Sequence, residues 1–73
     1  MWYRGYYGSW KDMTFTRIEG TYSRKEIVDR ARMAAAKHNT TVTVMGERGT
    51  RMVFFQVCPD GSIIEAGTAY KEV

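Results

Sequence analysis

One segment of the sequence carries the signals of a helix, and this limits what the 73-residue chain can fold into. Residues 23–26 match a capping box, in which the Ser23 hydroxyl accepts from the Glu26 amide and the Glu26 side chain reaches back to the Ser23 amide. Apolar residues then recur at helical spacing, at Ile27, Ala31, Ala34 and Ala35. Asn39 is suited to the left-handed residue that ends a helix. We therefore expect a helix over residues 23–38 whose buried stripe is mostly alanine.

The sequence after the helix alternates with a period of two and predicts three strands. They are expected over residues 40–45, 50–57 and 62–68, with an extension to residue 70 left open. Tight turns are expected at 46–49 and at 58–61, where Pro59 and Gly61 fit positions i+1 and i+3 of a type I turn.

Two further segments before the helix favour strands, residues 13–18 and, less clearly, residues 2–7. Whether residues 1–11 form a strand or a loose arm is left open. The predicted fold class is α+β, in one domain over residues 1–73. A single helix packs on one face of a curled antiparallel sheet of four to five strands, in the order β(β)αβββ.

Cys58 and His38 are the only cysteine and histidine in the chain. This excludes an internal disulfide and a zinc site of the finger or ribbon type. The two residues are also the only candidates for a cysteine nucleophile with its base, and nothing in their spacing brings them together. We therefore expect no enzymatic activity, no catalytic residue, no cofactor and no metal.

No apolar run approaches the roughly 18 residues of a transmembrane helix. The first seven residues lack the continuous apolar stretch of a secretory signal. Together with a single free cysteine, these features predict a cytoplasmic protein that does not bind a membrane.

Alternation within the predicted strands divides their side chains between two faces. The expected core face holds Val42, Val44, Val53, Phe55, Val57, Ile64 and Ala66. The other face would show Met45, Met52, Phe54 and Ile63, which is too apolar for contact with water. Because one helix covers one face, a second cover is needed. The candidates are the N-terminal aromatic segment, curling of the sheet, a second copy of the chain, or a different macromolecule.

Protein–protein binding accounts for this second face most simply, because Tyr, Trp, Met and Arg are enriched at interface cores. The partner is another protein, or a second copy in a homodimer. The expected anchors are Met52, Phe54 and Ile63, with a rim formed by Arg51, Tyr6, Tyr7 and Trp10. In size and type the chain resembles small accessory or inhibitor proteins of phages and mobile elements, an expectation that no particular residue carries.

Nucleic-acid binding is the alternative, because the net charge of +3 is unevenly distributed. Residues 1–37 hold eight basic and four acidic residues, while residues 38–73 hold three basic and four acidic ones. The candidate contacts are the N-terminal aromatic residues together with Arg4, Lys11, Arg17, Lys25 and Arg32. Residues 51–55 are similar to the aromatic strand of an RNA-recognition motif, but they lack its Gly-Phe-Gly/Ala-Phe core and the order of elements differs.

Overall fold

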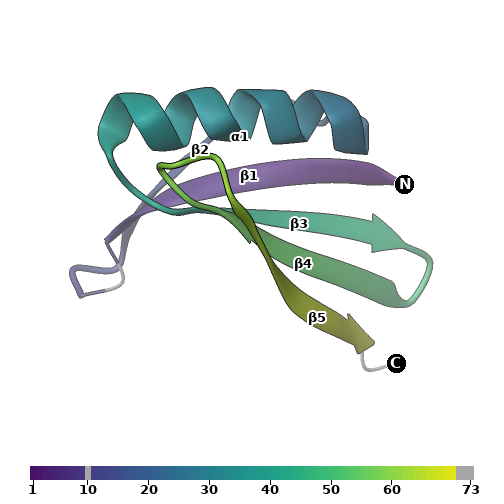
Figure 1. The fold of residues 1–73 in the computed structure, drawn as a ribbon. Coiled ribbons are helices and arrows are strands. Elements are labelled where there is room, and N and C mark those ends of the chain that lie inside the picture. Colours follow the sequence, from purple (N-terminus) through teal and green to yellow (C-terminus); the bar gives the residue numbers. More distant parts are fainter. Residues whose placement is uncertain (10, 71–73) are drawn as a thin grey trace.

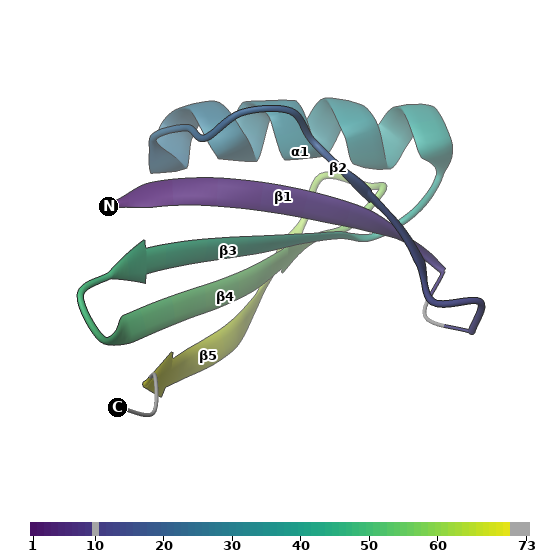
Figure 2. The ribbon, with the colours of Figure 1, turned by 180° about the vertical axis from the view of Figure 1, so that it is seen from behind.

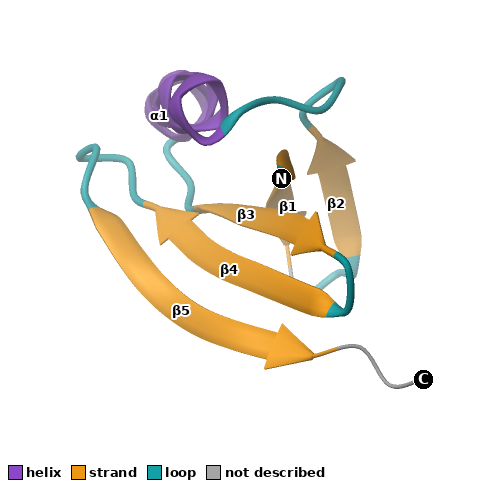
Figure 3. Ribbon diagram, turned by 90° about the vertical axis from the view of Figure 1, so that its right-hand side faces the viewer, coloured by secondary structure: helices purple, strands orange, loops and turns teal. Residues whose placement is uncertain are grey.

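The computed structural model describes residues 1–9 and 11–70. Its elements are β1 (Trp2–Ser9), β2 (Thr14–Arg17), α1 (Arg24–His38), β3 (Val42–Arg48), β4 (Arg51–Val57) and β5 (Ile63–Tyr70). The five strands form one antiparallel sheet in the spatial order β2-β1-β3-β4-β5, and α1 lies across one of its faces (Figure 1). The predicted α+β fold with a single helix is confirmed. The sheet is also curled, because β2 rises beside the helix while β3, β4 and β5 lie beneath it (Figure 3).

Local signals place both ends of α1 where the sequence predicts them. Ser23 is the N-cap, and its hydroxyl accepts from the Glu26 amide at 3.4 Å. The reciprocal contact differs from the prediction, since the Glu26 carboxylate accepts from the Ser23 hydroxyl at 3.0 Å instead of from the Ser23 amide. At the other end Asn39 is left-handed, with φ 48°, and the amides of Asn39 and Thr40 both donate to the Ala35 carbonyl. These two hydrogen bonds to the Ala35 carbonyl end the helix.

The core lies between α1 and the sheet. Its buried residues are Tyr3, Ile27, Ala31, Ala35, Val42, Val44, Phe55 and Val57. Ala31 and Ala35 are fully buried, so the predicted alanine stripe is the face that packs on the strands. Short side chains on this stripe let the helix backbone lie close to the sheet.

Strand β3 continues through Gly46, which the sequence analysis assigned to a turn. Gly46 is buried and lies opposite Tyr3 in β1 and Val53 in β4. A Cβ atom on Gly46 would come within 2.5 Å of Cε1 of Tyr3, so the tyrosine ring occupies the space above the glycine. The hairpin turn instead follows Arg48, and Gly49 adopts the φ of +60° that it needs. The pairing of Tyr3 with Gly46, with the aromatic ring over the glycine, is therefore part of a longer β3 than the sequence predicts.

The predicted turn at residues 58–61 is confirmed by its hydrogen bonds. The Gly61 amide donates to the Cys58 carbonyl at 2.8 Å, and Gly61 has φ +88°. The Asp60 carboxylate accepts from the Ser62 amide at 2.9 Å and from the Ser62 hydroxyl at 2.6 Å. Nε of Arg32 donates to the Gly61 carbonyl at 3.1 Å, which ties the turn to the helix.

The first turn of α1 is linked to β4 and β5 through Arg24. Its guanidinium lies 4.5 Å from the centre of the Phe55 ring and pairs with Glu65 at 3.0 Å. A side-chain hydrogen bond with Tyr3 and then the bond to Glu65 raise the pKa of Arg24 above its ordinary value. Arg24 is therefore a fixed cation that holds the helix start over Phe55, although the exposed ion pair itself adds little stability.

Strand β5 contains a bulge that reverses part of the predicted side-chain pattern. The register between β4 and β5 shifts at Phe54/Phe55. Ile63 lies opposite Val57 and packs against the core, whereas Ile64 lies opposite Gln56 and is 52% exposed. The prediction that Ile64 faces the core and Ile63 the other side is therefore wrong, because the inserted residue changes the phase of alternation along the strand. The side chain of Ala66, also expected in the core, lies outside the described part of the structure.

The packing of Tyr3 over Gly46 predicts an unusual cost for a small substitution. Gly46→Ala should lower the free energy of unfolding by about 1–3 kcal/mol, because the new methyl group overlaps a ring that the core holds in place. Chemical denaturation measures this. In a Tyr3→Ala background the same substitution should cost much less, since the obstructing ring is gone. An equal cost in both backgrounds would contradict the packing argument.

The hydrogen bonds from Ser62 lower the pKa of Asp60 from its ordinary value of 3.8, with the hydroxyl as the larger cause. The folded state therefore holds this proton less tightly than the unfolded chain. The stabilisation is complete above the ordinary pKa and is lost as pH falls through the folded pKa. In Ser62→Ala the pKa of Asp60 should rise towards 3.8, which a carboxyl-carbon NMR titration would detect. An unchanged pKa would refute the role of the hydroxyl.

Candidate functional site: the open face of the sheet

The face of the sheet opposite α1, here called the open face, carries large apolar side chains. Strand registers place the following residues on it: Arg4, Tyr6, Phe15, Thr43, Met45, Glu47, Met52, Phe54, Gln56 and Ile64. β1 lies inside the sheet, between β2 and β3. The idea that the N-terminal aromatic segment folds over this face is therefore wrong, because that segment is one of its strands.

An apolar groove runs across the open face near the β1–β2 hairpin. It has a volume of about 380 Å³, and the large side chains of Tyr6, Phe15, Met45 and Phe54 line it together with Thr41 and Thr43. The hairpin tip points away from α1, towards the side of the open face (Figures 1 and 2). Four strands thus contribute to one concave apolar surface, and the curl of the sheet shields it only in part, since Phe15 is 43% exposed.

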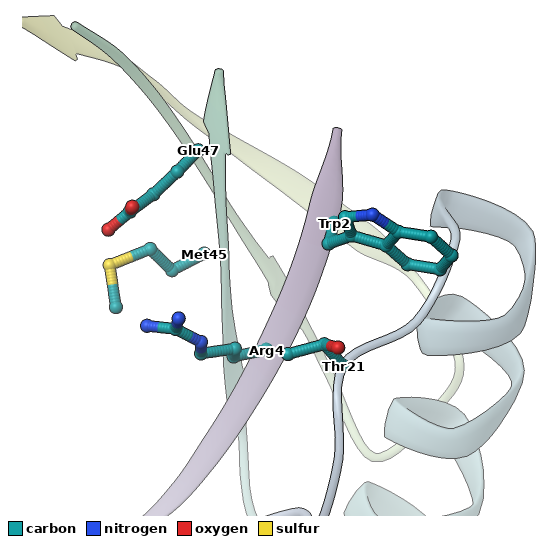
Figure 4. A pocket seen from close by; sticks show the side chains of 5 residues that line it. All are labelled: Trp2, Arg4, Thr21, Met45 and Glu47. Carbon is teal, nitrogen blue, oxygen red and sulfur yellow. The ribbon is translucent and has the colours of Figure 1, made fainter. Parts of the chain in front are cut away.

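A smaller hollow of about 190 Å³ adjoins the groove and is more polar. Its lining includes Trp2, Arg4, Met45 and Glu47. Arg4, Met45 and Glu47 extend to the same side of β1 and β3 (Figure 4). Met45 lines both hollows, so the two are neighbours. The open face therefore has apolar side chains in its groove and charges of both signs beside them, which is the arrangement of a protein interface.

Three of the predicted partner-binding residues lie on the open face as expected: Met52, Phe54 and Tyr6. Ile63 does not, since it packs against the core on the helix side. Trp10 lies outside the described residues.

The two remaining rim candidates belong to the helix side of the sheet. Tyr7 follows Tyr6 in the strand, so its ring points to the helix, where it stacks on His38 at 4.7 Å. Arg51 is exposed next to the β3–β4 turn, in phase with Phe55. Arg51 does not border the open face, because alternation puts it on the reverse. Tyr7 lines the apolar groove, as expected of a rim residue, although its ring lies on the helix side.

The structure adds open-face residues that were not among the predicted contacts. Phe15 joins the groove because β2 pairs with β1, placing Phe15 opposite Gly8. Ile64, which is 52% exposed, adds apolar surface. Alternation alone could have indicated Met45, whereas Phe15 required knowledge of which strands are neighbours.

The basic residues predicted to bind nucleic acid do not form one surface. Arg4 lies on the open face, and Lys11 lies in the β1–β2 turn. Lys25 is in the first turn of α1, and Arg32 bonds the β4–β5 turn on the β5 side of the helix. Arg17 lies in β2 at the opposite edge of the sheet.

The two candidates for nucleophilic chemistry have structural contacts. His38 stacks on Tyr7 with its Nε2 3.3 Å from the tyrosine hydroxyl, and the Cys58 backbone closes the β4–β5 turn. Within residues 1–9 and 11–70, no group of three or more His, Cys, Asp or Glu side chains is placed to hold a metal ion. Over the same residues, no helix has the length and apolar character needed to cross a membrane.

Comparisons of the chain with protein-family models, with curated proteins and with solved structures found no match.

The two neighbouring isoleucines of β5 provide a test of the face assignment. Ile63→Ala should lower the free energy of unfolding by about 2 kcal/mol, because it removes packing against the core. Ile64→Ala should cost under about 1 kcal/mol, because the side chain is largely in water. Denaturation of both variants under the same conditions measures the difference. A larger cost for Ile64→Ala would show that the faces are assigned the wrong way round.

Proposed function

We propose that this chain is a non-enzymatic binding protein that docks a partner protein on the open face of its sheet. The observation that carries the proposal is the apolar groove lined by Tyr6, Phe15, Met45 and Phe54. These side chains share one surface while the helix already covers the other face. An apolar concavity of this kind on a small domain is typical of an interaction site.

The residues of the open face would contribute to binding in two ways: apolar side chains are buried by the partner, and charged side chains orient it. Burying a side chain such as Phe54 or Met45 beneath a partner is worth roughly 1.5–3 kcal/mol. The hollow beside the groove holds Arg4 and Glu47, and charged groups at a rim set the orientation of a partner more than the affinity. A partner with apolar side chains at its centre and charges of both signs around them fits this surface.

A second copy of the chain meets this description as well, because the open face carries charges of both signs. We favour a different protein as the partner, in an accessory or regulatory role, and a homodimer is one of the outcomes that the experiment separates. The proposed location is the cytoplasm, supported by the single free cysteine.

Site-specific photo-crosslinking in the cells that make the protein tests the proposal. A photoreactive phenylalanine analogue replaces Phe54 in the groove, and a matched control carries it at Ala36, an exposed position of α1. We expect a discrete crosslinked protein from position 54 and none from position 36. Thermal unfolding of both labelled chains checks that each remains folded, as expected for residues outside the core.

The mass of the crosslinked product distinguishes the alternatives. A product of this chain plus a different protein supports the proposal, and its absence in an additional Met45→Asp variant localises binding to the groove. A product of twice the chain mass shows a homodimer and overturns the choice of partner. Equal products from both positions, or none from either, would contradict docking on the open face. Unfolding caused by substitution of Phe54 would place this residue in the core.

A further inference from the structure

A second groove lies on the helix side of the sheet, between α1 and the chain that leads into it. It has a volume of about 660 Å³. We call it the basic groove, after the four basic side chains that line it: Arg17, Arg30, Lys37 and His38. The segment between β2 and α1 runs beside the helix, in the opposite direction (Figure 2). The basic groove therefore collects charges from parts of the sequence that are far apart.

The residues that line the basic groove carry a net positive charge. They include three permanent cations, Arg17, Arg30 and Lys37, and one carboxylate, Glu19, which gives a net charge of +2. The whole chain carries +3. A concave surface that concentrates charge of one sign attracts ligands of the opposite sign. An anionic ligand is thus the one that this groove favours.

Contacts within the protein hold several of these groups in position. The Arg30 guanidinium lies 4.2 Å from the centre of the Tyr22 ring, and the Tyr22 hydroxyl donates to the Glu19 carbonyl at 2.7 Å. At the other end, His38 stacks on Tyr7 with an angle of 18° between the rings. Tyr7 is half-buried and packs against the core, while His38 is exposed. The His38 ring, which stacks on Tyr7, is thus exposed beside the cations of the groove.

We propose that the basic groove binds single-stranded nucleic acid, with its phosphates at Arg30 and Lys37 and a base against the exposed His38. Cations that follow a backbone, together with a ring on which a base stacks, are the elements of single-strand recognition. A duplex keeps its base faces stacked inside and cannot use such a ring. The helix C-terminus adds a partial negative charge here, but the amides of Asn39 and Thr40 cap the Ala35 carbonyl and Lys37 offsets it. This site does not depend on the open face.

Fluorescence anisotropy with labelled oligouridylate and oligothymidylate of about 12 nucleotides tests the proposal, since small domains bind up to about 16. Each phosphate contact to a single strand should weaken binding about 2.6-fold when salt rises from about 50 to 200 mM. Two cations therefore predict a loss of about sevenfold for the unmodified protein and about 2.6-fold for Lys37→Gln. The matched control is Lys25→Gln, which removes the same charge from an exposed helix position outside the groove.

The expected result is weaker binding with a shallower salt dependence for Lys37→Gln and Arg30→Gln, and nearly unchanged binding for Lys25→Gln. Equal effects of all three substitutions would overturn the site, since attraction would then depend on total charge alone. Equal binding of a polyglutamate peptide would show a general polyanion site, and stronger binding of a duplex would exclude the single-strand assignment. An absence of binding at about 50 mM salt would end the proposal.

Discussion

One helix has to cover a sheet of five strands, and the rest of the structure follows from this mismatch. A helix of 15 residues is about 22 Å long and about 10 Å wide. Strands lie about 4.8 Å apart, so such a helix shields about three of them. Accordingly α1 packs on β1, β3 and β4, and these strands supply every buried core residue among the sheet side chains that the structure describes. The second face of the same strands keeps its apolar side chains without a second layer.

The helix lies close to the sheet because small residues occupy both of the surfaces that face each other. Ala31 and Ala35 face the sheet, and Gly5 and Gly46 lie in the two strands beneath the helix. A Cβ atom on Gly5 would come within 2.8 Å of Cδ1 of Ile18, just as one on Gly46 would meet Tyr3. Large side chains from neighbouring segments thus fill the space that the glycines leave. On the open face the same two strands carry the longer side chains of Arg4, Tyr6 and Met45.

Much of the fold could be predicted from the sequence because its signals are local. The ends of α1 depend on Ser23 and Asn39, and the β4–β5 turn depends on residues 58–62, all of which act within a few positions. What could not be predicted depends on pairing between distant segments. Gly46 pairs with Tyr3 of β1 inside a longer β3. The bulge in β5 turns Ile63 to the core and Ile64 to the open face, and Phe15 reaches the open face through the pairing of β2 with β1.

The two proposed surfaces meet in β1 yet remain independent. Adjacent residues of this strand point to opposite sides, so Tyr6 lines the apolar groove while the ring of Tyr7 supports His38 in the basic groove. Apolar area is thereby concentrated on one side of the sheet and positive charge on the other. A protein docked on the open face would leave the helix side accessible. The same chain could then hold a protein and a nucleic acid together, although neither interaction requires the other.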